Sequence, residues 1–257
     1  MCTPLIIVNN RKVTIDTSFF QMICEDMGNK EQDFFYNTLY TSVEKNKRRT
    51  CREPSHDKYK QELWALENLK KNEQIDTLQL GVGDEEIWRH RYYEYYFKVS
   101  GNQDSIINKL SENYINGIKW MTEYYFDTCP DWRWNYVPYY APFISDLALY
   151  IKRQKIDMNK IKFENRKCIP MMSQLVSVLP PSCSYLLPNS YRHLVTTFES
   201  PIIDMFPSQI KIDTLYKNQL WQCVPRIPYL DIDRVLEATY ALPLDDNERE
   251  RASIQQV

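Results

Sequence analysis

The sequence lacks the cysteine and histidine patterns that bind zinc. Its 257 residues contain only three histidines. The seven cysteines are odd in number and scattered, with no C-x-x-C pair and no adjacent histidine ligand. They are Cys2, Cys24, Cys51, Cys129, Cys168, Cys183 and Cys223. A zinc site is therefore not expected, and scattered cysteines of this kind indicate a reducing, intracellular compartment, cytoplasmic or nuclear.

The sequence also lacks an excess of charge of either sign and any long hydrophobic run. The formal net charge is −2, from 32 basic and 34 acidic residues, so no field of the whole molecule attracts nucleic acid. No apolar segment approaches the roughly 20 residues of a membrane span, and the N-terminal apolar run is too short for a signal peptide. Because 43% of the residues are hydrophobic, a sizeable globular core is expected. Any contact with nucleic acid must be local.

Aromatic residues are abundant, and they concentrate at residues 114–148. Tyr114, Ile118, Met121 and Tyr125 have the three-and-four spacing of a helix face packed on a core. The sequence therefore predicts a helix that leads into the rest of this aromatic segment.

Prolines end this helix and predict a loop. Pro130 disfavours helical geometry at the residue before it, and Pro138 and Pro142 prevent regular pairing beyond it. Residues 131–140 are therefore expected to form an ordered aromatic loop, with Pro142 in the first turn of a second helix.

The aromatic side chains of this loop have two interpretations. In the first, the rings fill the core between the two helices. In the second, one or two of them stack on a ligand, since a base on an aromatic face contributes about 1–3 kcal/mol. Arg133 lies between the two tryptophans of the loop and suits a phosphate or a carboxylate. The candidate ligand contacts are Trp132, Arg133, Trp134, Tyr136, Tyr139 and Tyr140.

This segment resembles the signature of the XRN family of 5′-to-3′ exoribonucleases. In that family an aromatic helix leads into a tryptophan-x-tryptophan loop and a tyrosine-alanine-proline-phenylalanine helix start. The matching pieces are Gly117-Ile118-Lys119-Trp120, Tyr124-Tyr125, Pro130-Asp131-Trp132-Arg133-Trp134, Tyr136 and Tyr140-Ala141-Pro142-Phe143-Ile144-Ser145-Asp146-Leu147. Asp131 stands where the family usually has serine, and Tyr139 stands where it usually has histidine.

A second block resembles the same family in order and spacing. Its pieces are Gln174-Leu175, Val178-Leu179-Pro180-Pro181, Leu187-Pro188, Tyr191-Arg192, Ser200-Pro201-Ile202-Ile203-Asp204, Trp221-Gln222 and Pro228-Tyr229-Leu230-Asp231. Together the two blocks extend the resemblance over most of residues 15–253.

The resemblance implies a role in RNA processing. In the family a tryptophan of this loop stacks on bases near the 5′ end of the RNA. The resemblance implies this stacking role for Trp132 in the first place and for Trp134 in the second. The implied ligand is single-stranded RNA with a 5′-monophosphate.

The family's catalytic carboxylates have no counterpart in this sequence. XRN enzymes resemble two-metal nucleases, in which acids of a separate N-terminal domain hold the divalent ions that activate water. The acids of this chain are dispersed over helix starts and surfaces, so no catalytic or metal-binding residue is predicted. Mg²⁺ or Mn²⁺ is expected only in a partner, an acid-bearing nuclease domain or protein, and the chain alone is expected to be inactive.

The predicted fold is mainly α, like the helical half of the XRN enzymes, with a small two-stranded β excursion. We expect a single domain over residues 1–257, with an N-terminal arm at 1–15 and a basic linker at 44–56. The aromatic signature occupies 114–148, and weak alternation with β-branched residues predicts the β excursion at 208–226.

Capping residues and helical periodicity predict the other long elements. Asp16 begins a helix that continues through residues 17–39, with Gly28 as a weak point. Residues 85–98 form a helix that buries Ile87 and exposes Arg89.

A further helix is predicted near the C-terminus. It spans residues 231–242, and Tyr240 faces inward.

Two functions remain open. The chain is either an RNA-processing module that completes a nuclease together with an acid-bearing domain, or a non-catalytic structural or interaction protein that retains the fold. Retention of Trp132 and Trp134 favours the first function. The near-zero net charge and the missing acids favour the second.

Overall fold

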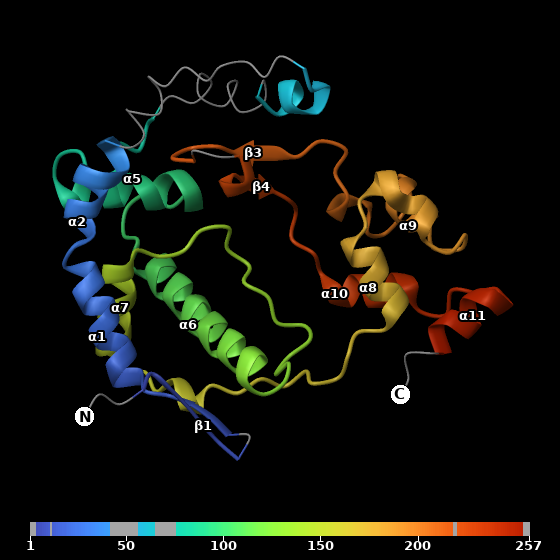
Figure 1. Cartoon of the computed structure of the whole chain (residues 1–257), viewed down its shortest axis with the longest axis horizontal. Coiled ribbons are helices and arrows are strands. Elements are labelled where there is room, and N and C mark those ends of the chain that lie inside the picture. Colours follow the sequence, from blue (N-terminus) through green and yellow to red (C-terminus); the bar gives the residue numbers. More distant parts are fainter. Residues whose placement is uncertain (1–3, 11, 42–55, 65–75, 218–219, 254–257) are drawn as a thin grey trace. The chain divides into compact units, whose positions relative to one another are not determined.

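The computed structural model describes residues 4–10, 12–41, 56–64, 76–217 and 220–253 (Figure 1). These residues form mostly helices, together with two two-stranded sheets. The predicted fold class, mainly α with a small β excursion, is confirmed. The predicted basic linker at 44–56 lies outside the described residues except for its last position.

The chain divides into two compact units, each assembled from several stretches of sequence. Unit 1 contains Met1–Cys129, Tyr136–Lys162 and Ile212–Val224. Unit 2 contains Pro130–Asn135, Phe163–Lys211 and Pro225–Val257. The aromatic loop is therefore shared, with its tryptophans in unit 2 and its tyrosines in unit 1.

Unit 1 is built on helices of different lengths and a short hairpin. Its elements are β1 (Ile6–Asn9), β2 (Lys12–Ile15), α1 (Thr17–Gly28), α2 (Glu31–Asp33), the π-helix η1 (Phe34–Tyr40), α5 (Glu85–Phe97), α6 (Asp104–Phe126), α7 (Ile144–Gln154) and the 3-10 helices η2 (Met158–Lys160) and η5 (Leu220–Gln222).

The hairpin β1–β2 lies within the predicted N-terminal arm. The strands pair antiparallel, with Ile6 opposite Ile15 and Asn9 opposite Lys12. Asn10 adopts the left-handed φ of 49° that a tight turn requires, and asparagine tolerates this conformation better than most residues. Ile15 is buried, so β2 attaches the hairpin to the core.

The first core of unit 1 lies where α1, α6 and α7 pack together, as Figure 1 shows. Its buried residues are Ile15, Cys24, Ile115, Leu147, Ala148, Ile151 and Met158. Gly28 allows α1 to approach α7 closely, because a β-carbon there would lie 3.0 Å from the α-carbon of Ser145. The predicted helix over residues 17–39 begins as expected, with Asp16 accepting a hydrogen bond from the backbone N–H of Phe19. It does not continue as one α-helix, because α1 ends at Gly28 and the chain turns before α2 and η1.

The buried face of α6 differs from the predicted one. Ile115 and Lys119 are buried, whereas Met121 is 45% and Tyr125 is 75% exposed. The buried ammonium of Lys119 is compensated, because it lies 3.0 Å from Oε1 of Glu123 and donates to the carbonyl of Val13. The periodicity of apolar residues failed here because a lysine occupies a core position.

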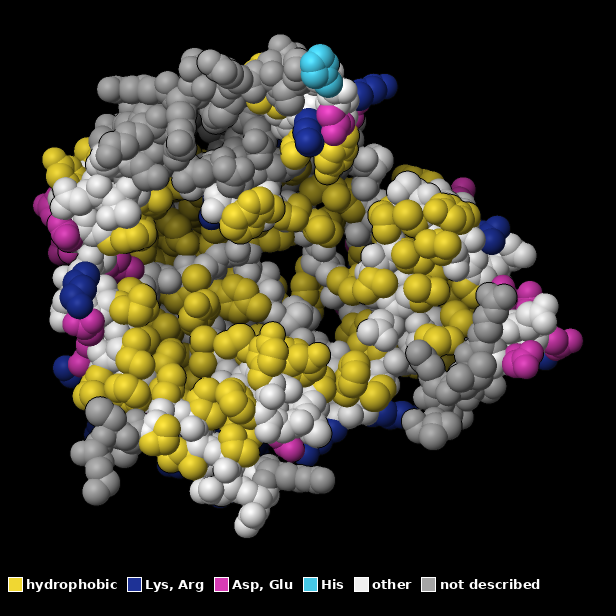
Figure 2. Space-filling view, in the orientation of Figure 1, with side chains coloured by type: hydrophobic (Ala, Val, Ile, Leu, Met, Phe, Trp, Pro, Cys, Tyr) yellow, Lys and Arg dark blue, Asp and Glu magenta, His cyan; other side chains and the backbone are white. Residues whose placement is uncertain are grey.

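Apolar side chains gather over α6 on the face shown in Figure 2. The exposed large apolar residues of this helix are Met121, Tyr124, Tyr125 and Phe126. Trp120 is half-buried and stacks on Tyr124, with ring centroids 5.2 Å apart. The C-terminal half of α6 therefore presents aromatic rings to solvent in the described structure.

The second core of unit 1 is aromatic. Trp88 is fully buried and meets Phe143 edge-on at 5.1 Å and Phe35 at 5.2 Å. Such edge-to-face pairs add about 0.5–1.5 kcal/mol to the area they bury. The exposure predicted for α5 was wrong at two positions, since Ile87 is 55% exposed and the side chain of Arg89 is largely buried.

Unit 2 consists of short helices around one core. Its helices are α8 (Met171–Val178), η3 (Pro181–Leu186), α9 (His193–Thr196), η4 (Ile203–Met205), α10 (Ile232–Thr239) and α11 (Asp246–Ser253). The buried core residues are Val176, Leu187, Tyr191, Leu194, Val195, Ile202, Met205 and Val235. Asp231 caps α10 by accepting from the N–H groups of Asp233 and Arg234. Tyr240 is 84% exposed rather than inward, because α10 ends at Thr239 and Tyr240 is already extended.

The predicted β excursion is present within residues 208–226. Strands β3 (Lys211–Asp213) and β4 (Val224–Arg226) form a two-stranded sheet and are shorter than the alternation suggested. None of the helices in the described segments is both long and apolar enough to cross a bilayer.

Candidate functional site

The loop that carries the two tryptophans is held by one carboxylate. Within unit 2, Oδ1 of Asp131 accepts hydrogen bonds from the N–H groups of Arg133 at 2.8 Å and Trp134 at 2.9 Å. Its Oδ2 accepts from the backbone and the side chain of Asn165, both at 3.2 Å. Trp132 also donates its N–H to the carbonyl of Asn165 at 2.9 Å. The aspartate therefore fixes this turn through several donors.

The charge state of Asp131 follows from these contacts. Burial raises the pKa of the carboxyl group, but hydrogen bonds from Arg133, Asn165 and Trp134 lower it more, so the net pKa lies below the usual value. The carboxylate is therefore the form that holds the loop at neutral pH.

Replacing Asp131 with asparagine is expected to lower the free energy of unfolding by about 1–3 kcal/mol at pH 7. The pKa of Asp131 is lower in the folded than in the unfolded chain. The stabilisation by its carboxylate is therefore complete above the unfolded pKa of about 3.9, and it is lost as pH falls through the folded pKa. Urea denaturation of both proteins at pH 7 and near pH 3 measures this. The difference between them should shrink at low pH, and a difference that grows would contradict the assignment.

The two tryptophans differ in their surroundings. Trp132 is 38% exposed. Trp134 is half-buried and meets Phe163 edge-on at 6.2 Å. Arg133 donates from Nη1 to Oδ1 of Asp233 at 2.7 Å, and both side chains are exposed. A phosphate at Arg133 would therefore compete with Asp233, while Trp132 is partly exposed to solvent.

The three tyrosines of the loop belong to unit 1, where hydrogen bonds and ring contacts hold Tyr136 and Tyr140. Tyr136 donates its hydroxyl to the carbonyl of Tyr140 at 2.9 Å, and burial, with Tyr114, raises its pKa. Tyr140 stacks on Tyr96 at 3.8 Å. Its hydroxyl donates to the buried carboxylate of Asp213. Tyr139 is 44% exposed.

The six predicted contact residues therefore form two groups. Trp132, Arg133 and Trp134 share one turn of unit 2, and Tyr136, Tyr139 and Tyr140 lie in unit 1. No single unit brings all six together. Their roles toward a ligand stay predictions.

The helix start that follows the loop is fixed by a buried ion-pair network that sequence patterns did not indicate. Nη1 of Arg89 lies 3.2 Å from Oε2 of Glu31 and donates to Oγ of Ser145 at 2.7 Å. Nη2 of the same guanidinium pairs with Asp146. Glu31 also accepts from the N–H of Ile144 at 2.9 Å. Residues 144–146 are thereby anchored to α2 and α5.

The guanidinium of Arg89 remains charged in this setting. Burial lowers the pKa of Arg89, but Asp146 and Glu31 raise it more, so the net shift is upward. The ring of Phe143 lies 4.8 Å from the guanidinium carbon and adds a cation–π contact. The Ser-Asp pair of the signature thus stabilises the fold, and nothing in its geometry requires a ligand.

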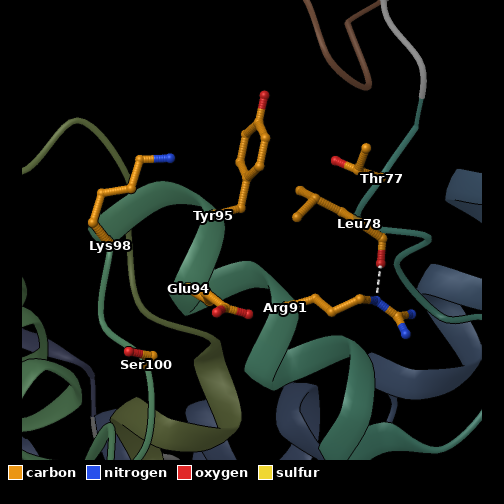
Figure 3. Close-up of a pocket in the computed structure, with 7 residues that line it drawn as sticks. All are labelled: Thr77, Leu78, Arg91, Glu94, Tyr95, Lys98 and Ser100. Atoms are coloured by element: carbon orange, nitrogen blue, oxygen red, sulfur yellow. Dashed lines mark hydrogen bonds between the residues drawn. The ribbon is translucent and has the colours of Figure 1, made fainter.

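A separate pocket beside α5 has a volume of about 480 Å³ (Figure 3). Thr77, Leu78, Arg91, Glu94, Tyr95, Lys98 and Ser100 line it. Arg91 donates to the carbonyls of Leu78, Gln79 and Val82, so its guanidinium is engaged in holding the preceding loop. Lys98 lies over the ring of Tyr95 at 5.1 Å. None of the six predicted contact residues lines this pocket.

No group of three or more histidine, cysteine, aspartate or glutamate side chains within the described segments could hold a metal ion. The acids near the candidate site act in other ways. Asp131 organises the tryptophan turn, Asp213 accepts from Tyr140, and Asp233 pairs with Arg133. This part of the chain therefore offers stacking and hydrogen bonding as its chemistry.

Comparison with known proteins agrees with the resemblance in the sequence. Residues 7–256 match the family described as the Xrn1 helical domain. A 5′-3′ exoribonuclease 2 of Chaetomium globosum is 35% identical over 166 residues, which are 64% of this chain and 15% of that protein. A 5′-3′ exoribonuclease 1 of Saccharomyces cerevisiae is 33% identical over 168 residues, 65% of this chain and 11% of that protein.

A plant relative shows the same pattern. A 5′-3′ exoribonuclease 2 of Arabidopsis thaliana is 36% identical over 153 residues, 59% of this chain and 14% of that protein. The chain thus matches only a small part of the length of these relatives. Because the family match covers nearly all of the sequence, the chain belongs to the Xrn1 helical-domain family.

Proposed function

We propose that this chain is the helical module of a 5′-to-3′ RNA-degrading assembly and that it helps to hold the 5′ region of single-stranded RNA. In this proposal a separate acid-bearing nuclease domain supplies the metal site for hydrolysis, with Mg²⁺ or Mn²⁺ as the ion. The site of action is intracellular, cytoplasmic or nuclear. Relatives named as 5′-3′ exoribonucleases support the class of substrate.

The observation that carries the proposal is the exposed ring of Trp132 on a fixed turn. Asp131 and Asn165 restrain the backbone on both sides of this ring. A ring that is held in place before the ligand arrives loses little conformational freedom on binding. Stacking on a base requires only such a face and tolerates any sequence.

Replacing Trp132 with alanine is expected to weaken binding of single-stranded RNA by about 1–3 kcal/mol, because one stacked base loses its platform. The measurement is fluorescence anisotropy of a 5′-monophosphorylated oligoribonucleotide with the chain and a nuclease-domain partner, in EDTA so that the RNA stays intact. Trp221→Ala is the matched control, because Trp221 is 81% exposed outside the loop, and it should leave the affinity unchanged.

The denaturant midpoint of the same variant separates the two functional classes. If stacking is the role, Trp132→Ala should cost less stability than the loss of a fully packed ring, since Trp132 is 38% exposed. Unchanged RNA affinity with a loss of about 3–5 kcal/mol would assign the ring to packing and remove the RNA role.

The alternative is a non-catalytic structural or interaction protein. Two features favour it: Tyr136 and Tyr140 are engaged by groups of the chain itself, and Arg133 is paired with Asp233. In this case the exposed rings of α6 would be covered by a protein partner rather than by RNA.

A further inference from the structure

A strongly basic segment begins in the last turn of α7 and continues beyond the helix. Between residues 152 and 162 the sequence has five cations and a single acid, Asp157, although the whole chain has a net charge of −2. We name this segment the α7 basic strip. Its cations are Lys152, Arg153, Lys155, Lys160 and Lys162, and all are exposed.

Hydrogen bonds to Ile15 and Thr17 fix the backbone of the α7 basic strip. Asn159 exchanges hydrogen bonds with both the N–H and the carbonyl of Ile15, each at 2.9 Å. Met158 is fully buried and donates its N–H to Oγ1 of Thr17 at 3.1 Å. Lys155 has a left-handed φ of 50° that ends α7 and redirects the chain. The cations therefore project from an ordered frame.

A hollow of about 290 Å³ opens within the strip. Lys155 and Lys160 both line it, together with the side chains of Asn116, Gln154 and Tyr150, which can donate hydrogen bonds. Glu112 and Asp157 are its two acids. Asp157 lies 3.9 Å from Lys160, and Glu112 is the second opposing charge in the hollow.

Helix-end electrostatics explains only part of this arrangement. Lys152 and Arg153 lie in the last turn of α7, where cations offset the negative end of the helix dipole. Lys160 and Lys162 lie beyond the helix, so this effect does not account for them. Lys160 reaches Asp157 only at 3.9 Å, and its side chain is 84% exposed, so the pair is worth little.

We propose that the α7 basic strip binds the sugar-phosphate backbone of single-stranded RNA, with Lys155 and Lys160 as its central contacts. The inference rests on the proposed function, since it names a second contact surface for the same ligand. The strip lies in unit 1, whereas Trp132 lies in unit 2. Lysine suits this role because it contacts phosphate as a point charge and reads no sequence.

The double variant Lys155→Gln/Lys160→Gln tests the strip. The full chain is titrated with a 5′-hydroxyl single-stranded oligoribonucleotide at several salt concentrations, so that recognition of a 5′-phosphate plays no part. The slope of log affinity against log salt should fall by about 1.4, since each lost phosphate contact removes about 0.7 for single strands. The affinity itself should fall about tenfold at low salt.

Two further variants serve as controls. Lys98→Gln/Lys109→Gln removes the same charge from exposed positions of unit 1 outside the strip, and it should leave the salt slope unchanged. Glu112→Gln removes one of the two opposing charges from the hollow and should strengthen RNA binding severalfold. An increase of this kind cannot result from damage to the fold.

Three outcomes would overturn the proposal. These are equal losses for the two double variants, no gain from Glu112→Gln, or competition by polyglutamate as effective as competition by RNA of equal charge. The proposed function is tested separately, through Trp132→Ala with the nuclease-domain partner. If Trp132→Ala weakens RNA binding but Lys155→Gln/Lys160→Gln does not, the α7 basic strip is rejected as an RNA contact and the proposed function stands.

Discussion

Replacing Arg89 with methionine is expected to lower the free energy of unfolding by about 3–5 kcal/mol, because it leaves two buried carboxylates without their cation. The side chains of Glu31 and Asp146 are 7% and 13% exposed, so water cannot take over the role of the guanidinium. Urea denaturation followed by far-UV circular dichroism measures the loss. Under conditions in which Arg89→Met is folded, its affinity for RNA should equal that of the unchanged protein.

The matched control for Arg89 is Lys30→Met. Lys30 pairs with Asp26 at 2.7 Å, but the two side chains are 70% and 68% exposed, so the expected loss is below about 1 kcal/mol. The triple variant Glu31→Gln/Arg89→Met/Asp146→Asn should recover much of the stability, because it removes the stranded charges together. A loss for Arg89→Met no larger than for Lys30→Met would show that the network contributes nothing to stability.

Replacing Gly81 with alanine is the second substitution expected to have a large effect, a loss of about 2–5 kcal/mol in the free energy of unfolding. A β-carbon at Gly81 would lie 2.5 Å from the backbone nitrogen of Tyr36 and 2.6 Å from the carbonyl carbon of Phe35. Its φ of +80° adds about 1–2 kcal/mol for any other residue, and the forced displacement adds about 1–3 kcal/mol. The urea midpoint of the variant gives the measured value.

The variant Gly83→Ala separates the effect of the positive φ from the effect of the close approach to neighbouring backbone. Gly83 has a similar φ of +84°, but a β-carbon there would meet no described atom within 4 Å. Gly83→Ala should therefore cost only about 1–2 kcal/mol, which is the backbone effect alone. Equal losses at Gly81 and Gly83 would mean that the close approach to Phe35 and Tyr36 does not limit the site.

Local signals predicted the starts of helices better than their ends or their buried faces. Asp16 and Asp231 were identified as caps because a cap needs only a short polar side chain and the next few N–H groups. The core faces of α5 and α6 were misassigned at Arg89 and Lys119, since apolar periodicity treats a charged residue as exposed. Arg89 is neutralised by Glu31, which is distant in sequence, and Lys119 by Glu123, one turn further along the same helix.

The hairpin at residues 6–15 could have been predicted. Ile6, Ile7 and Val8 form a β-branched run on one strand, Val13 and Ile15 flank Thr14 on the other, and Asn9 and Asn10 lie between them. In contrast, nothing near Gly28 in the sequence indicates Ser145 as its neighbour.

The sequence located the candidate site but did not predict which of its side chains are exposed and which are bound to other residues of the chain. The density of rings and the family resemblance indicated the loop, and Trp132 is exposed on it. Composition could not distinguish Tyr140 from Tyr139, because the partner of Tyr140 is Asp213, far along the chain. The role of Asp131 likewise depends on Asn165, although it stands where serine is usual in the family.

The segmented make-up of the two units limits how this protein can be divided or rearranged. The polypeptide passes between them at residues 129–130, 135–136, 162–163, 211–212 and 224–225. Neither unit therefore corresponds to one uninterrupted coding segment. A single deletion that removes one whole unit also removes part of the other, and a cut at 135–136, 162–163 or 211–212 leaves both units incomplete. Transfer of either unit to another protein is thus expected to carry residues of the other unit with it.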